Sequence, residues 1–131
     1  MAMADRHGLP VACGIASGQR HEAHLVKDLL NSRFVEEKPL NLIGDKAYDS
    51  NILDAEMAAE GIEMIAPNQV TRRQQTQDRR RLRRYCRRWR IERLFAWLMR
   101  SRRLVTRYEH KAQNFLALLQ LACAQLLWRR F

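Results

Sequence analysis

The amino-acid sequence predicts an α/β fold in which helices pack on a small sheet. Three short apolar runs alternate with two segments of helical periodicity before residue 67, and two longer helical segments follow. This order is typical of α/β layers. An apolar fraction of 47% supports a real core and argues against disorder, although the net charge is +10. The length of 131 residues predicts a single domain that spans residues 1–131.

The first half of the chain is predicted from short apolar runs and the turn residues that flank them. Gly8 and Pro10 mark an opening turn, and Gly61 is a good C-terminal stop for the helix before it. Apolar residues spaced three and four apart indicate helices, whereas short runs between turn signals indicate strands. The predicted elements are a strand at 9–16, a helix at 22–30, a strand at 40–43, a helix at 52–60 and a strand at 62–66.

The second half is predicted to contain a basic loop and two helices. Residues 69–82 are polar and basic without apolar periodicity, which indicates a loop, and the basic segment as a whole extends over 69–84. A long helix is predicted over 83–103. Its apolar stripe consists of Ile91, Leu94, Phe95 and Leu98. A last helix at 112–128 is interpreted as a core helix, because its apolar stretch is too short for a membrane span and contains two glutamines.

The charge is divided unevenly along the chain. Residues 1–71 hold 6 basic and 11 acidic side chains, a net charge of −5, whereas residues 72–131 hold 18 basic and 3 acidic ones, a net charge of +15. Such asymmetry indicates a globular half joined to a half that binds a polyanion. Nucleic acid is the first candidate for the polyanion, and a membrane surface is the second.

The cysteines indicate neither a zinc site nor a disulfide framework. Cys13, Cys86 and Cys123 lie far apart, are odd in number and form no CxxC pair. Each is expected to be a small, buried or partly buried apolar residue in a reducing compartment. The N-terminus lacks the apolar segment of a signal peptide. The sequence therefore predicts a cytoplasmic protein without a membrane partner.

The first candidate site is the segment Gly44-Asp45-Lys46-Ala47-Tyr48-Asp49-Ser50. A predicted strand delivers Asp45 at its carboxyl end, where α/β folds commonly place functional groups. Asp49 or Ser50 is expected to cap the next helix. The alternative is that Asp and Gly after a strand are ordinary turn residues, and periodicity alone leaves that alternative open.

The second candidate site surrounds Glu92, which lies among the arginines of the second half. On a continuous helix, Tyr85, Arg88 and Glu92 project from one face, because they are spaced three and four apart. The alternative is an ordinary Arg88–Glu92 ion pair on a solvated face, worth a few tenths of a kcal/mol. Taken alone, the spacing favours this alternative.

The two acids and the basic surface together have the composition of a metal-dependent nuclease. Carboxylates are hard oxygen ligands that suit Mg²⁺ or Mn²⁺. Two bound ions activate the attacking oxygen and stabilise the leaving oxygen of a phosphoryl displacement. Arginines neutralise phosphate and fix the strand.

These residues also resemble a known family. GDKAYDS resembles the DKGYDS segment of bacterial insertion-sequence transposases of the DDE class, and Tyr85-x-x-Arg88-x-x-x-Glu92 resembles the YREK signature of the same group. The similarity extends from about residue 8 to residue 131. It implies an RNase H-like mixed sheet with packed helices, truncated at its N-terminus. It also implies two divalent metals, Mg²⁺ or Mn²⁺, and the cutting and joining of DNA at element ends.

The resemblance assigns roles to individual residues. Asp45 is the second catalytic and metal-binding Asp, and Glu92 is the catalytic and metal-binding Glu. Tyr85 and Arg88 help to hold DNA or the site. The first catalytic Asp of the family lies upstream of the segment that resembles residues 8–22, outside this sequence, and Asp5 is a poor substitute. An upstream reading-frame product is therefore an expected partner, besides DNA and a second copy of the chain in a homo-oligomer.

Further basic residues are candidates for phosphate contact. The family has a basic residue seven positions after the Glu, where this chain has Met99, so Arg100 or Arg103 is expected to serve instead. The arginine run of the basic segment favours sequence-independent phosphate contact. The candidates for DNA binding are Lys46, Arg80, Arg84, Tyr85, Arg88, Arg100 and Arg103.

Three functions remain open at the level of sequence. The leading one is a transposase catalytic domain that binds DNA and contributes Asp45 and Glu92 to a metal site, incomplete by itself. The second is a non-enzymatic DNA-binding remnant of a decayed transposase, and the third is a protein that binds structured RNA. Whether the chain is an enzyme on its own is left open. Trp89 and Trp97 are expected to pack in the core, with DNA contact by Trp89 as the alternative, and His21 and His24 are expected on the surface.

Overall fold

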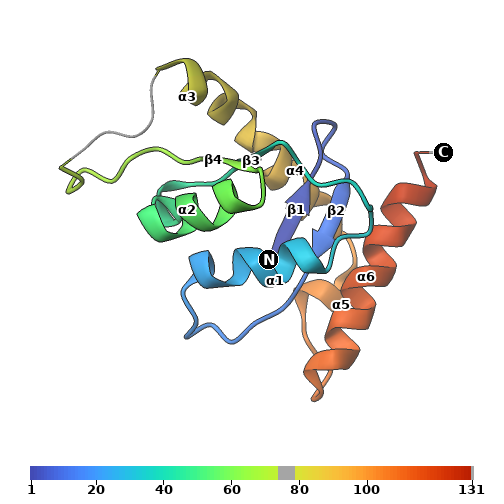
Figure 1. The fold of residues 1–131 in the computed structure, drawn as a ribbon. Helices are drawn as coiled ribbons and strands as arrows, with labels where there is room; N and C mark the ends of the chain where they lie inside the picture. Colours follow the sequence, from blue (N-terminus) through green and yellow to red (C-terminus); the bar gives the residue numbers. More distant parts are fainter. Residues whose placement is uncertain (74–78, 131) are drawn as a thin grey trace. The chain divides into compact units, whose positions relative to one another are not determined.

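The computed structural model describes residues 1–73 and 79–130, and for residues 79–81 it describes the backbone alone (Figure 1). The chain divides into two compact units. Unit 1 consists of Met1–Gly18, Lys27–Phe34 and Trp89–Phe131, and unit 2 consists of Gln19–Val26 and Val35–Arg88.

Unit 1 begins with an antiparallel hairpin. Strand β1 (Ala2–Ala4) pairs with strand β2 (Pro10–Cys13), with a register irregularity after Met3. In the turn between them, Asp5 Oδ1 accepts hydrogen bonds from the backbone N–H groups of His7 and Leu9, both at 2.8 Å. Gly8 has φ +80°, a conformation that favours glycine. The predicted opening turn is thus confirmed.

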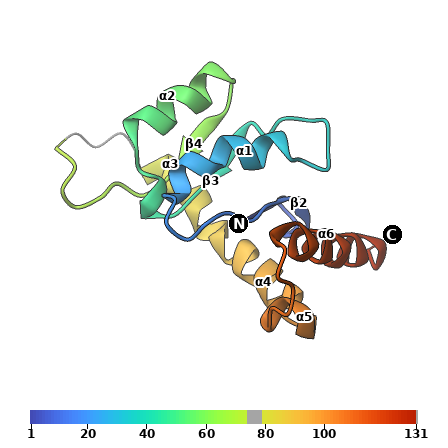
Figure 2. The ribbon, with the colours of Figure 1, turned by 90° about the horizontal axis from the view of Figure 1, so that it is seen from below.

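Three helices complete most of unit 1: α4 (Trp89–Leu98), α5 (Arg102–Val105) and α6 (Ala112–Trp128). Helix α6 packs against β2, α4 and α5, and α4 also packs against β1 (Figures 1 and 2). Leu94 and Leu98 on α4 are almost fully buried. The buried core of the unit comprises Cys13, Leu94, Leu98, Leu104, Ala122 and Cys123.

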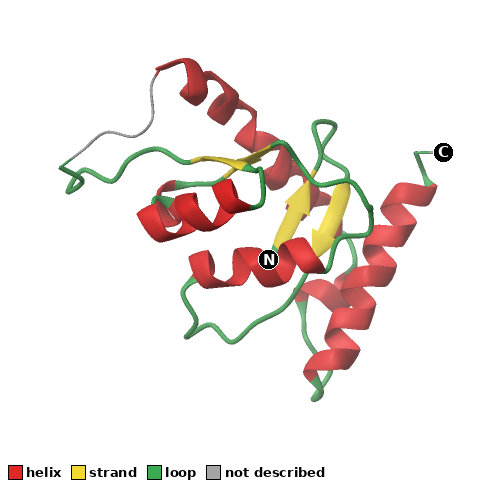
Figure 3. Ribbon diagram, viewed as in Figure 1, coloured by secondary structure: helices red, strands yellow, loops and turns green. Residues whose placement is uncertain are grey.

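Unit 2 is built on a parallel strand pair. Strand β3 (Asn41–Ile43) pairs with β4 (Glu63–Ile65), and the 3₁₀ turn η2 (Lys46–Tyr48) and helix α2 (Asn51–Ala59) lie between them in the sequence (Figure 3). A parallel pair needs such a crossover connection. Helix α2 packs on β4 and buries Leu53 and Met57. Ser50 caps α2, since its hydroxyl accepts a hydrogen bond from the Leu53 N–H at 3.5 Å.

The remaining elements lie where the sequence passes from one unit to the other. The 3₁₀ turn η1 (Glu22–Leu25) leads into helix α1 (Val26–Asn31), which together correspond to the predicted helix at 22–30. Helix α3 (Arg79–Tyr85) and the 3₁₀ turn η3 (Cys86–Arg88) close unit 2, where α3 contacts β4.

The predicted α/β class is confirmed, and the architecture is consistent with an RNase H-like transposase domain. The strands of the described residues are hydrogen-bonded in two pairs, one antiparallel and one parallel. Strand β1 was not predicted, because three residues at the start of the chain carry too little alternation to be recognised as a strand. The predicted strands at 40–43 and 62–66 and the helices at 52–60 and 112–128 are observed within one or two residues of their ends.

The predicted continuous helix over 83–103 is wrong. The chain is helical in α3, tightens into η3, continues as α4 to Leu98 and begins again as α5. Arg83 and Arg87, like Arg84 and Arg88, are like charges four positions apart, which destabilise an α-helix. Ser101 is a favourable N-cap residue, and it opens α5.

Two further details differ from prediction. Phe95 was assigned to the apolar stripe of this helix, but 39% of its surface is exposed. The loop predicted over 69–82 ends earlier, because α3 begins at Arg79; residues 74–78 of that segment lie outside the described residues. Within the described residues, no helix is long and apolar enough to cross a membrane.

Candidate functional site

Asp45 lies directly after β3, at the carboxyl end of the parallel pair. It is the N-cap residue of η2, and its Oδ1 accepts a hydrogen bond from the Ala47 N–H at 2.9 Å. Its side chain is 42% exposed. One carboxylate oxygen thus holds the backbone, and the side chain remains accessible to solvent.

Gly44 allows the chain to pass close to its neighbours just before Asp45. A Cβ atom at this position would lie 2.7 Å from Met64 Cε and 2.7 Å from Tyr48 Cδ2. The backbone of Gly44 is also held by β4, because its N–H donates to the Ile65 carbonyl at 3.0 Å. The position of Asp45 is therefore set by packing on both sides of the strand end.

Arg88 lies against Asp45 within unit 2. Its Nη1 is 3.7 Å from Asp45 Oδ2, and its guanidinium lies 5.7 Å from the centre of the Tyr85 ring. An ion pair of this length between partly exposed side chains stabilises the fold by less than about 1 kcal/mol. The structure thus brings Arg88, which is far from Asp45 in sequence, to Asp45, and Tyr85 lies near the same guanidinium.

Asp49 is the other acid of the segment, and its role differs from that of Asp45. Its side chain is 3% exposed. Its carboxylate accepts hydrogen bonds from the Asn68 amide at 3.1 Å, from the Gln69 N–H at 2.6 Å and from the Arg72 guanidinium. Asp49 therefore fastens the segment after β4 to the segment after β3, a contact that sequence reasoning missed.

Tyr48 connects η2 to η1. Its hydroxyl donates a hydrogen bond to Glu22 Oε2 at 3.1 Å. Burial first, and then the negative charges of Glu22 and Asp45, raise the pKa of Tyr48 well above its ordinary value. The Tyr48 side chain is therefore a neutral hydrogen-bond donor beside Asp45.

Glu92 is an exposed residue in the first turn of α4. It belongs to unit 1, whereas Asp45 belongs to unit 2, so its place beside Asp45 stays a prediction. The single-face arrangement of Tyr85, Arg88 and Glu92 assumed an unbroken helix, and η3 interrupts that helix. Among the described residues, no group of three His, Cys, Asp or Glu side chains is arranged to hold a metal ion.

A comparison with protein families decides the class of this chain. The model of the transposase DDE domain matches residues 1–127. The chain belongs to this family. Comparisons with curated proteins and with solved structures gave no match. Because the chain belongs to the transposase DDE family, its function is related to transposition.

Several basic residues of this transposase domain are engaged in its own structure. Arg84 donates to Asn41 Oδ1 and lies 3.3 Å from Glu63 Oε2, so it ties α3 to the strand pair. Arg103 Nη1 lies 3.5 Å from Glu109 Oε1, although the Arg103 side chain is 71% exposed. Lys46 is exposed next to Asp45, and the side chain of Arg80 lies outside the described residues.

Arginines also hold the hairpin turn of the domain. Arg90 donates to the Arg6 carbonyl, and Arg93 donates to the His7 carbonyl. The Arg93 guanidinium lies 4.7 Å from the Trp89 ring centre and 4.8 Å from the Trp97 ring centre. Trp89 is half exposed, so it does not lie in the core, and the guanidiniums of Arg90 and Arg93 lie over its ring.

The cysteines and histidines have local roles. Cys13 and Cys123 are buried in the core of unit 1, as expected, whereas Cys86 is exposed and departs from the expected burial. A hydrogen bond with Cys13, followed by burial, raises the pKa of the Cys123 thiol. His21 is exposed and caps η1 through its Nδ1, which accepts from the Ala23 N–H at 3.3 Å.

Proposed function

We propose that this transposase DDE domain binds DNA and contributes Asp45 and Glu92 to a divalent-metal site that cuts and joins DNA strands during transposition. The proposal includes membership of the YREK-signature group of bacterial insertion-sequence transposases. It also includes assembly as a homo-oligomer on element ends and target DNA, with an upstream reading-frame product as a further partner.

One observation carries the proposal: Arg88 of one motif, with Tyr85 packed on its guanidinium, lies against Asp45 of the other motif. The two motifs are separated by about forty residues in the sequence, and ordinary turn residues need no such partner. The match to the transposase DDE domain gives this meeting its functional meaning. It favours a functional Asp45 over an ordinary turn residue.

The donor chemistry of the two acids fits Mg²⁺ or Mn²⁺. Both are carboxylates with exposed surface, and such cations prefer carboxylate oxygens. When bound, divalent ions supply activation of the attacking oxygen and charge stabilisation at the leaving oxygen. Asp45 is held in place for this role by Gly44 and by its capping hydrogen bond.

Arg88 has a separate role beside the carboxylates. Its guanidinium is planar and always charged, so it can move from the long Asp45 contact to a phosphate oxygen of a DNA strand. Tyr85 limits the orientations of the guanidinium by lying under it. Lys46, Arg80, Arg84, Arg100 and Arg103 are proposed as further phosphate contacts.

The catalytic proposal is tested by nicking of supercoiled plasmid DNA in Mg²⁺ or Mn²⁺, with the upstream reading-frame product added in every assay. Asp45→Asn and Glu92→Gln should each lower the nicking rate by more than about 100-fold, since even partners of metal ligands cost about 10–100-fold. Glu56→Gln, an exposed acid on α2, is the matched control and should leave the rate unchanged. A second readout loads Fe²⁺ and maps hydroxyl-radical cleavage of the protein backbone, which should occur near residues 45 and 92.

Two outcomes would contradict this assignment. If Glu92→Gln kept the nicking rate, Glu92 would not be a metal ligand. If the unmodified protein bound DNA but neither nicked it nor showed Fe²⁺-directed backbone cleavage, the protein would be a DNA-binding remnant without catalysis.

A further inference from the structure

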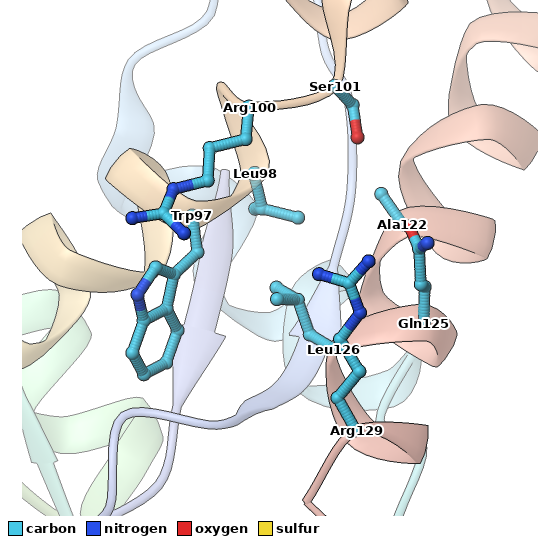
Figure 4. Close-up of a pocket in the computed structure, with 8 residues that line it drawn as sticks. All are labelled: Trp97, Leu98, Arg100, Ser101, Ala122, Gln125, Leu126 and Arg129. Carbon is cyan, nitrogen blue, oxygen red and sulfur yellow. The ribbon is translucent and has the colours of Figure 1, made fainter.

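Unit 1 contains a pocket between the end of α4 and the last turns of α6 (Figure 4). Trp97 and Arg100 lie on its α4 side, and Gln125 and Arg129 lie on its α6 side. Its volume is about 220 Å³. The other lining residues are Leu98, Ser101, Ala122 and Leu126.

The pocket carries positive charge. Arg100 and Arg129 line it, and none of its described lining residues is acidic. Arg130 adds a third guanidinium, 5.2 Å from the Trp97 ring centre. The C-terminal ends of α4 and α6 oppose this charge with only about half a negative charge each. The two full positive charges of the lining arginines therefore outweigh the two helix ends, and the pocket favours an anion.

Polar groups for a phosphate are present beside these arginines. Ser101 is the N-cap residue of α5, yet its side chain makes no capping hydrogen bond to that helix. Gln125 adds an amide from the exposed side of α6. A guanidinium, a hydroxyl and an amide N–H all donate hydrogen bonds to phosphate oxygens.

The size and the walls of the pocket limit the ligand. Sites for whole drug-sized molecules have volumes of about 300–1,000 Å³, and this pocket is smaller. Arg93 and Arg130 already lie over the Trp97 ring, so Trp97 is better suited as an apolar wall than as a stacking platform. These features suit one phosphate with the sugar next to it, and not a stacked base.

We propose that this pocket is a phosphate subsite that holds one backbone phosphate of a DNA strand, with Arg100 and Arg129 as its charged contacts. The inference rests on the proposed DNA-binding function and deepens it, because it adds α6 residues to the DNA surface. Sequence reasoning selected Arg100 alone, since Arg129 is remote from the family motifs.

The test uses Trp97 fluorescence in the full chain carrying Trp89→Phe and Trp128→Phe. A five-residue thymidine oligonucleotide should change the Trp97 emission, inorganic phosphate should do so more weakly, and thymidine without phosphate should not. Arg100→Gln with Arg129→Gln should raise the Kd for the oligonucleotide at least about tenfold, as expected for lost charge-assisted hydrogen bonds. The slope of log Kd against log salt should fall by about 0.7, the value for one phosphate of a single strand.

The control variant combines Arg102→Gln with Lys111→Gln. It removes the same charge from exposed positions of unit 1 outside the pocket, and it should change the Kd less than about twofold. If the two double variants raised the Kd equally, the proposed subsite would be overturned. The same would follow if hexaglutamate competed for the pocket as well as the oligonucleotide does. If the unmodified protein did not bind duplex DNA in a gel shift, the proposed DNA-binding function itself would be rejected. DNA binding without any pocket-specific effect rejects the subsite alone.

Discussion

Asp45 and Asp49 are four positions apart in the sequence, yet the structure uses their carboxylates differently. Asp49 is buried and accepts hydrogen bonds from Asn68, Gln69 and Arg72. Asp45 is partly exposed and faces Arg88 at 3.7 Å. A carboxylate that is inaccessible and fully partnered supports the fold, whereas a partly exposed one with a single long ion pair is available to a ligand. Both residues are aspartates, so the environment of each carboxylate is what distinguishes the structural Asp49 from the candidate functional Asp45.

Tyr48 leads to a prediction about pH at the residue scale. Its folded-state pKa is raised by burial and by Glu22 and Asp45. The stability that it contributes is fully present below the ordinary tyrosine pKa of about 10. Above that pH the unfolded chain loses the phenol proton first, so this stability is lost as the pH rises toward the folded-state pKa.

Urea unfolding between about pH 8 and pH 11 should therefore show a smaller alkaline loss of stability in Tyr48→Phe than in the unmodified protein. Glu22→Gln should lower the pKa of Tyr48, measured by the absorbance of the phenolate. If the unmodified protein and Tyr48→Phe lost the same free energy of unfolding over this pH range, the raised pKa of Tyr48 would be contradicted.

At the scale of elements, packing sets the position of the site. The β3–β4 pair, η2 and α2 form one crossover unit, and Asp45 lies at the carboxyl end of β3. Helix α4 is a separate element of unit 1, with Leu94 and Leu98 buried and Glu92 exposed. Each candidate acid thus sits at the edge of its own small core.

Gly44→Ala tests the close packing at the end of β3. The added methyl group would overlap Met64 and Tyr48, and overpacking of this kind costs about 1–3 kcal/mol. Gly18→Ala is the matched control, because no atom lies within 4 Å of a Cβ placed there. It should change stability by less than about 1 kcal/mol. Urea unfolding followed by circular dichroism measures both, and equal midpoints for the two variants would argue against tight packing at Gly44.

At the scale of the whole molecule, the net charge of +10 governs association with a polyanion. If about six phosphates are neutralised, the affinity for duplex DNA should fall about 10³-fold between roughly 50 and 200 mM salt. A gel shift over this salt range measures the slope. An affinity insensitive to salt would contradict backbone binding, and stronger binding of duplex RNA at the same salt would favour the structured-RNA alternative.

Most features that depend on residues close together in the sequence were predicted correctly, and features that depend on distant residues were not. Helix α6 was predicted at its observed bounds, and Gly61 marked the end of α2, because local periodicity and backbone preference define these features. The break at η3 was missed, since the apolar stripe that predicted the helix lies wholly after η3 and carries no information about it. The single-domain assignment of residues 1–131 and the roles of Asp45 and Glu92 stay predictions.

The sequence by itself determined the α/β class, most elements, the basic second half and the two motifs that led to the transposase DDE family. Each depends on composition or on the spacing of nearby residues. Only the tertiary structure decided that Arg88 lies beside Asp45, that the nearly inaccessible Asp49 side chain is an anchor and that Arg100 and Arg129 share a pocket. These contacts join residues far apart in the chain, and their geometry depends on how whole elements pack.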